Sequence, residues 1–150
     1  MTRDMFRKTE KRLYSYPHNL SLIGELAGKI AQLRDRGDVH AQDYGGRVKA
    51  GASDADPVGA YVQNLLTLEH RISVLEQATR PVTALLECLE VSAEPAHKHC
   101  LTILREFYFS RTPASKLLEA TGWHRSTFYS RRLSLVIMAA SFFGFCAETE

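Results

Sequence analysis

The amino-acid sequence predicts an all-α protein. Apolar residues recur at spacings of three and four over long stretches, which is the pattern of an amphipathic helix. No alternation typical of a half-buried β-strand runs for a useful length. Proline and glycine punctuate the chain where helices are expected to start and stop.

Length and composition are those of an ordinary globular chain. The 150 residues are 45% hydrophobic and 24% charged, which excludes disordered and collagen-like classes. The net charge of +2 does not indicate a strongly acidic or strongly basic partner. Between His97 and Ile137, however, the sequence has seven basic residues and only two acidic ones. The basic character is therefore local, and it lies in the C-terminal part of the chain.

Cysteine usage and the lack of a leader indicate a cytoplasmic protein. Three cysteines far apart, without a CxxC pair, suit reduced thiols better than disulfides. The N-terminus is charged and has no apolar core of a secretory signal. The most apolar stretch, 133–147, is shorter than the roughly twenty residues that span a bilayer. We expect a buried helix there and no membrane partner.

The first helical pattern covers residues 3–36. Because proline removes an amide donor and disfavours helix in the residue before it, Pro17 predicts a short helix to about Tyr16 and a second helix from Asn19. From 37 to 56 the apolar period vanishes among glycines and small residues, and we expect a flexible linker, with a partner-binding segment as the alternative. The expected apolar stripe consists of Leu13, Tyr16, Leu20, Ile23, Ala27 and Ile30, widened by Leu26 and Leu33.

The second long helix carries the clearest pattern. Asp56 can cap its N-terminus, with Pro57 at the first helical position. Pro81 lies off the stripe, so we expect a kink or a restart near Arg80. The pattern resembles a coiled-coil seam, whose partner is the first helix folded back in an antiparallel hairpin, a second copy, or both. The stripe consists of Val58, Tyr61, Leu65, Leu68, Ile72, Leu75, Thr79, Val82, Leu86 and Leu89.

The C-terminal part predicts a helix-turn-helix. A break at 93–95 precedes a helix over 97–109. Thr112 as N-cap and Pro113 at the first helical position open a short helix to Ala120, and Gly122 ends it in a tight turn. A second helix begins near His124. We therefore divide the chain into a coiled-coil-like hairpin over 1–93 and a helix-turn-helix domain over 94–150.

The second helix of such a unit lies in the major groove of DNA. Ala114, Leu117 and Leu118 are assigned to the inner face of the first helix, and Trp123 and Phe128 hold the second helix against it. Side chains outside this core can contact duplex DNA. Arg125 is the predicted contact to a guanine, and the other arginines and the lysine are predicted to bind phosphates. The alternative is a solvated basic face. The predicted DNA-binding residues are Arg111, Lys116, His124, Arg125, Ser126, Thr127, Tyr129, Ser130, Arg131 and Arg132.

The run "REFYFSRTPASKLLEATGWHRSTFYSRRLSLVIMAASFF" resembles the region-4 helix-turn-helix of sigma factors. The segments "SDADPVGAYVQNLLTLEHRISVLEQ" and "KTEKRLYSYPHNLSLIGELAGKI" are similar to small phage-encoded transcriptional regulators of the RinA, ArpU and LtrC kind. His124 departs from the family's usual Ser or Thr cap, which predicts a weaker cap and an imidazole near the DNA phosphates. The resemblance implies regulation of phage or prophage genes, late or packaging genes above all, with RNA polymerase as a further partner.

The predicted function is that of a sequence-specific transcriptional regulator. A helical assembly protein, such as a phage small terminase subunit, is the alternative. We expect a dimer held by Phe142, Phe143 and Phe145, because the apolar residues after Arg132 exceed what one face of a monomer needs. No catalytic set stands out, so no enzyme activity and no cofactor are expected.

A zinc site was weighed at His97, His99 and Cys100, because these residue types ligate zinc. Residues two apart on a helix diverge by about 200° in direction, so the two histidines are poorly placed to share one ion. We therefore expect no metal.

Overall fold

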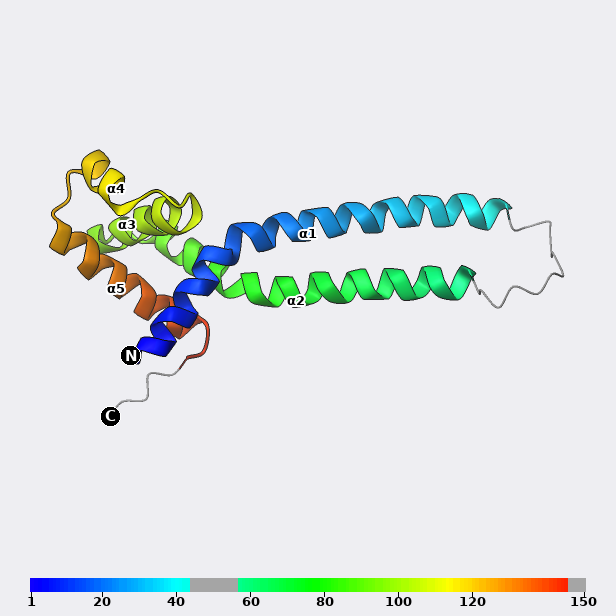
Figure 1. Cartoon of the computed structure of the whole chain (residues 1–150), viewed down its shortest axis with the longest axis horizontal. Helices are drawn as coiled ribbons and strands as arrows, with labels where there is room; N and C mark the ends of the chain where they lie inside the picture. Colours follow the sequence, from blue (N-terminus) through cyan, green and yellow to red (C-terminus); the bar gives the residue numbers. More distant parts are fainter. Residues whose placement is uncertain (44–56, 146–150) are drawn as a thin grey trace. The chain divides into compact units, whose positions relative to one another are not determined.

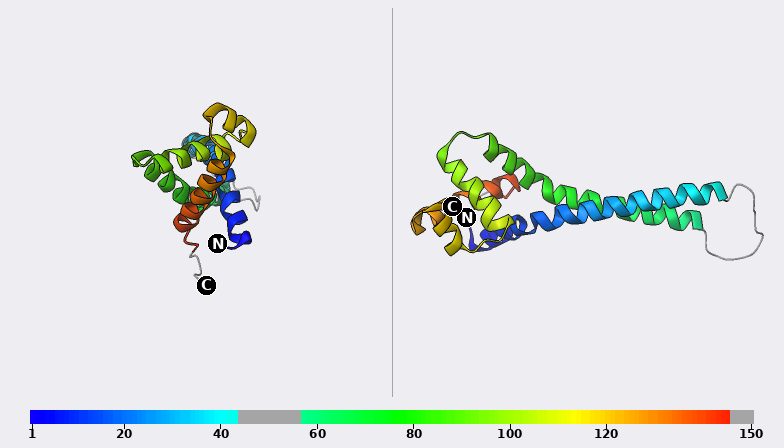
Figure 2. Two further views of the ribbon diagram at one scale, coloured as in Figure 1. Left: turned by 90° about the vertical axis from the view of Figure 1, so that its left-hand side faces the viewer. Right: turned by 90° about the horizontal axis from the view of Figure 1, so that it is seen from above.

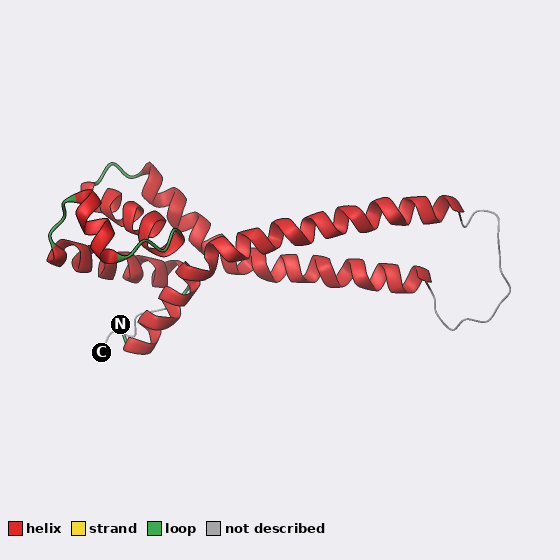
Figure 3. Cartoon of the chain, turned by 45° about the horizontal axis from the view of Figure 1, so that its top comes forward, coloured by secondary structure: helices red, strands yellow, loops and turns green. Residues whose placement is uncertain are grey.

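The computed structural model describes the backbone of residues 1–43 and 57–145, and the side chains of 1–36 and 57–145. Within these ranges the elements are helical and joined by short loops, so the predicted all-α class is confirmed there (Figure 3). The predicted N-cap Asp56 and most of the predicted linker, 44–56, lie outside the described residues. The elements are α1 (Arg3–Asp43), α2 (Pro57–Val91), α3 (Pro95–Thr102), the π-helix η2 (Ile103–Phe109), α4 (Ala114–Thr121) and α5 (Arg125–Phe142) (Figure 1).

The chain forms two compact units. The hairpin unit consists of Leu20–Glu76, and the second, which we call the C-terminal unit, consists of Met1–Asn19 together with Gln77–Glu150. Both long helices pass from one unit into the other. The C-terminal helices thus share a compact unit with the beginning of α1 and the end of α2, whereas the sequence suggested a division at residue 93.

In the hairpin unit α1 and α2 run antiparallel side by side, as two views show (Figures 1 and 2). Leu26 and Ile30 are buried, and Arg34 pairs with Glu69 at 3.2 Å. The predicted intrachain hairpin is therefore confirmed. The seam on α2 is only half-buried at Tyr61, Leu65, Leu68, Ile72 and Leu75.

Two details of the predicted stripe on α1 are wrong. Leu20 is 44% exposed and Ala27 is also exposed, whereas Leu26, which was expected only to widen the stripe, is buried. The spacing of three and four fits both registers, so the sequence alone did not separate them. The larger side chain at position 26 is the one that the hairpin buries.

Neither proline ends its helix. Pro17 lies inside α1 and Pro81 inside α2, so the predicted break at Tyr16 and the predicted restart near Arg80 are wrong. A proline in a helix costs about 3 kcal/mol. Burying one large apolar side chain stabilises by about 1.5 to 3 kcal/mol, and α2 buries several beyond Pro81. These are Val82, Leu85 and Leu89, each 1% exposed.

The predicted linker begins too early. Residues 37–43 continue α1, which ends at Asp43 rather than at Arg36. A glycine costs a helix only about 1 kcal/mol, so Gly37 does not stop a helix that is already propagating.

The core of the C-terminal unit collects side chains from every element in it. Phe128 and Tyr108 are fully buried, and the ring of Tyr108 lies 4.9 Å from that of Tyr14 on α1. Along α5, Leu135 and Val136 are buried and Met138 is half-buried, so the apolar run is mostly core. The members are Leu13, Tyr16, Val82, Leu85, Leu89, Cys100, Ile103, Leu104, Tyr108, Leu117, Phe128, Leu135, Val136 and Ala139.

The helix predicted over 97–109 differs in start and in type. It begins at Pro95, which occupies the first helical position, and it continues after Thr102 as the π-helix η2. The amide of Ser110 closes this element by donating to the carbonyl of Arg105, five residues back, at 2.9 Å. A π-helix is rare and has no signature in an apolar pattern, so the sequence did not predict it.

None of the helices in the described ranges is long and apolar enough to cross a membrane.

Candidate nucleic-acid interface

A glycine turn separates α4 from α5, as predicted. Gly122 has φ 71°, and its amide donates to the carbonyl of Leu118 at 2.9 Å. Only two further residues, Trp123 and His124, precede α5. The start of α4 is shifted by one residue, because Pro113 rather than Thr112 occupies the N-cap position. The order of elements, a short helix, a tight turn and a longer helix, is the one that the predicted helix-turn-helix requires.

His124 caps α5 in place of the expected hydroxyl residue. Its Nδ1 accepts a hydrogen bond from the Ser126 amide at 3.3 Å and lies 2.8 Å from Ser126 Oγ. With Nδ1 accepting, the ring proton is carried on Nε2. The cap that was expected to be weakened is therefore made by the imidazole, and the exposed ring retains a donor.

Aromatic rings anchor the beginning of α5 to α3 and η2. The Trp123 ring lies 4.6 Å from the imidazole of His99, and the Phe128 ring lies 5.4 Å from that of Phe107. The sequence assigned Trp123 and Phe128 to packing against the preceding short helix. These ring contacts show that the earlier helix segment, 95–109, also supports the beginning of α5.

The first half of α5 presents a polar face. Arg125, Ser126, Tyr129 and Ser130 are exposed, and Tyr129 retains 48% of its surface. α5 contains no acidic residue along its whole length. Lys116 on α4 is also exposed. These side chains offer guanidinium, ammonium and hydroxyl donors with no carboxylate on the same helix, which suits base edges and phosphates.

Arg132 is engaged inside the C-terminal unit. Its Nε donates to Glu10 Oε1 at 2.9 Å, and its Nη2 donates to the same oxygen. Tyr108 Oη also donates to Glu10 Oε1, at 2.7 Å. The guanidinium lies 5.1 Å from the ring centroid of Phe107 and 5.7 Å from that of Phe6. Since α5 turns this side chain inward, Arg132 holds the helix in place within the protein.

The electrostatics of this cluster favour the ion pair. Burial on its own would lower the pKa of Arg132, but the hydrogen bonds to Tyr108 and Glu10 outweigh it and raise the pKa. Burial, followed by the hydrogen bond to Glu10, raises the pKa of Tyr108 far above its usual value. Arg132 therefore stays charged and Tyr108 stays a donor at physiological pH.

Three other predicted contacts lie elsewhere or are partly covered. Arg111 is in the loop between η2 and α4, with φ 54°, and its guanidinium lies 5.2 Å above the ring of Tyr14. Thr127 and Arg131 are half-buried on α5. The carbonyl of Arg131 accepts from the Cys100 thiol at 3.6 Å, and burial raises the pKa of that thiol.

The histidines considered for zinc have separate partners. His97 Nδ1 lies 2.6 Å from Ser92 Oγ, and its Nε2 lies 3.3 Å from Glu94. His99 packs on Trp123, and its buried Nδ1 has no hydrogen-bond partner among the described side chains. No group of three or more potential ligands gathers in the part of the chain that the structure describes.

Sequence reasoning missed two features of this region. Glu10 and Phe6 support α5 from a distance of more than a hundred residues along the chain, and no local signal marks them. Leu133 and Ile137 continue the exposed face of α5 and are each 49% exposed. Their spacing of four from Tyr129 was the available signal.

We predict opposite effects of adding a methyl group at two glycines. Gly122→Ala should destabilise the protein by about 1 to 2 kcal/mol, because an alanine is strained at a positive φ. No neighbouring atom lies within 4 Å of the added carbon, so a steric clash does not contribute. Gly24→Ala, inside α1 and equally unobstructed, should stabilise by about 0.5 to 1 kcal/mol. Urea unfolding measures both, and equal signs would contradict the assigned turn.

The Glu10 contact should matter more than an exposed ion pair. Glu10→Gln should lower the free energy of unfolding by about 1.5 to 3 kcal/mol, because it weakens charged hydrogen bonds of the half-buried Arg132. Asp4→Asn is the matched control: it breaks the exposed pair with Lys8 at 2.8 Å and should cost about 0.5 kcal/mol or less. Similar losses in both variants would show that Glu10 does not anchor α5.

Comparison with known proteins gives no match. No known protein family, no curated protein and no solved structure matches the chain. The resemblance to sigma region 4 and to phage regulators stays a prediction.

Proposed function

We propose that this protein is a sequence-specific DNA-binding transcriptional regulator of the cytoplasm. The observation that carries the proposal is the polar, acid-free N-terminal half of α5, which follows a glycine turn and is anchored from behind by Phe128. In helix-turn-helix proteins this half of the second helix contacts base edges in the major groove.

The side chains divide into two roles. Arg125, at the first position of α5, is the proposed base contact, because a guanidinium binds guanine O6 and N7 through two hydrogen bonds. Lys116, Ser130 and the Nε2 proton of His124 are proposed phosphate contacts, which set the register of the protein on the duplex. Arg132 is not part of this proposed surface, since Glu10 holds it within the fold.

The target genes are proposed from the family resemblance. Phage or prophage genes, in particular late or packaging genes, are the proposed targets, and RNA polymerase is a further proposed partner. The rival function, a packaging assembly protein, draws support from the long hairpin of α1 and α2, which is a form suited to oligomerisation. A ring of many copies with weak sequence preference would favour packaging.

Salt dependence tests DNA binding directly. The full chain should bind random-sequence duplex DNA in a fluorescence anisotropy titration, with log Kd rising linearly with log salt concentration, because its cationic side chains displace counterions condensed on the DNA phosphates. A labelled poly-glutamate of equal charge is titrated as the control for attraction to any polyanion, and it should bind more weakly than the duplex. Failure to bind duplex DNA even at low salt would refute the proposed function.

Substitutions separate the two roles. After selection of a preferred site, Arg125→Ala should cost about 1 to 3 kcal/mol there and relax the preference at one position. Lys116→Ala should weaken all duplexes alike and reduce the salt slope by about one. Arg80→Ala, an exposed arginine on α2, is the matched control and should change neither. Unchanged binding of Arg125→Ala to the selected site would refute the placement of α5.

A further inference from the structure

Beyond its polar half, the exposed face of α5 becomes apolar. Leu133 and Ile137 lie one helical turn apart and are each 49% exposed, although both belong to the helix that supplies much of the core. They continue the line of Ser126, Tyr129 and Ser130 at helical spacing. DNA phosphates and base edges give these two aliphatic side chains little to bind.

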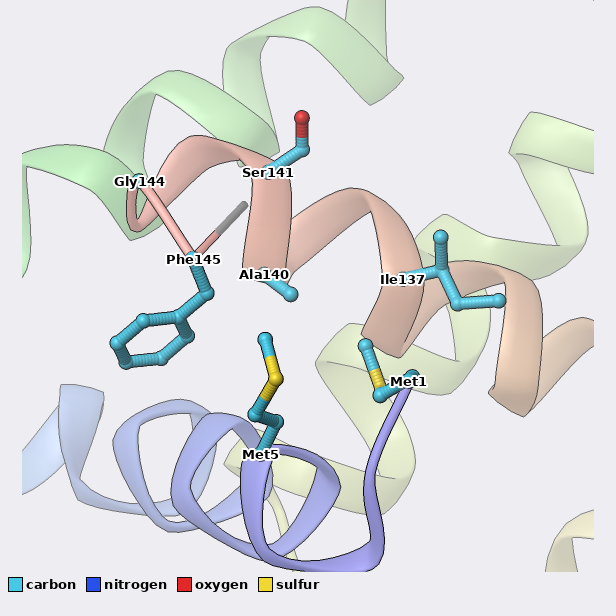
Figure 4. Close-up of a pocket in the computed structure, with 7 residues that line it drawn as sticks. All are labelled: Met1, Met5, Ile137, Ala140, Ser141, Gly144 and Phe145. Carbon is cyan, nitrogen blue, oxygen red and sulfur yellow. The ribbon is translucent and has the colours of Figure 1, made fainter. Parts of the chain in front are cut away.

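A cavity of about 380 Å³ adjoins Ile137 within the C-terminal unit. It lies between the beginning of α1 and the end of α5, and the close-up shows Met1 and Met5 facing Ile137 and Ala140 across it (Figure 4). Methionine side chains are flexible and adapt to an inserted apolar group. The lining residues, none of which has a charged side chain, are Met1, Met5, Ile137, Ala140, Ser141, Gly144 and Phe145.

We propose that this apolar face, with its cavity, is the interface to a second copy of the chain. A two-fold interface uses the same surface on both partners, so it needs a projecting group and a recess side by side. Leu133 and Ile137 provide the projection, and the cavity between Met5 and Ala140 provides the recess.

The charge pattern favours a second copy over other occupants. The segment 133–142 has no charged residue, so two copies would meet there without like-charge repulsion. A nucleic acid or a charged peptide would find no counter-charge on segment 133–142. A small ligand would need several convergent polar groups to fix its orientation, and the side chains of the lining supply only the hydroxyl of Ser141.

The position along α5 also suits a dimer on DNA, and this step rests on the proposed function. Arg125 and Ile137 are twelve residues apart on one helix, which corresponds to about 18 Å. A two-fold axis near Ile137 would therefore separate the two copies of Arg125 by at most about 36 Å, and half-sites lie about 34 to 36 Å apart.

This interface differs from the one expected from sequence. Phe143 and Phe145 both contact Arg12, whose guanidinium lies 5.0 and 5.1 Å from their ring centroids. Their rings therefore pack within the chain, and of the three phenylalanines Phe142, at 40%, is the exposed one.

Sedimentation equilibrium of the full chain tests the proposal. The wild type should be a dimer at micromolar concentration, and Ile137→Glu should raise the dimer Kd at least 100-fold. Leu133→Glu should do the same; it lies outside the cavity lining and decides the matter if Ile137→Glu does not fold. Val62→Glu, at a 46% exposed valine of the hairpin unit, is the matched control and should leave the dimer intact. Circular dichroism should show unchanged helicity in all three.

The outcomes separate the interface from the proposed function. A wild-type monomer, or dissociation by Val62→Glu but not by the α5 variants, would overturn the interface, even if the protein binds DNA. A dimer that Ile137→Glu dissociates, but that binds no duplex, would support the interface and refute the function. Tight binding of wild type to a two-half-site duplex, with Ile137→Glu losing at least tenfold affinity there but not on a single half-site, would support both.

Discussion

The position of α5 depends on a carboxylate at the other end of the chain. Glu10 accepts hydrogen bonds from both Arg132 and Tyr108, so one oxygen joins α1, η2 and α5. The rings of Phe6 and Phe107 enclose the same guanidinium. A charge with this burial is stable only while its partner is present, because an unpaired buried charge is costly. The proposed DNA-reading helix is thus held by residues outside the proposed helix-turn-helix.

Along α5, the exposed helix face is polar in its N-terminal half and apolar after Ser130. Residues up to Ser130 offer hydroxyl and guanidinium groups, whereas Leu133 and Ile137 offer only apolar surface. Because successive turns of one helix are rigidly connected, the proposed DNA contacts and the proposed dimer contacts are fixed at a set distance from each other. The proposed dimer contacts would therefore fix the distance between the two proposed DNA-reading segments without a separate linker.

The two-helix hairpin follows a different rule. Two helices can cover only one side of each other, so the seam of α2 stays half-buried at Leu65, Leu68 and Ile72. Full burial occurs where α3, η2 and α5 add further layers, as at Val82 and Leu89. Stability is therefore concentrated in the C-terminal unit, which explains how α2 continues through Pro81 there.

The sequence by itself determined the helical class, the two long amphipathic helices and the glycine turn at Gly122, because periodicity and turn chemistry are local properties. It left open whether the long helices pair within one chain, which the tertiary structure decided. It misjudged Pro17 and Pro81, because the burial that offsets a helix breaker comes from distant elements, and it misjudged the end of α1, because one glycine costs a propagating helix little. Tertiary structure alone decided that Arg132 turns inward toward Glu10 and that Ile137 stays outside. These outcomes depend on which residues meet across more than a hundred positions of chain, and neither spacing nor composition records such encounters.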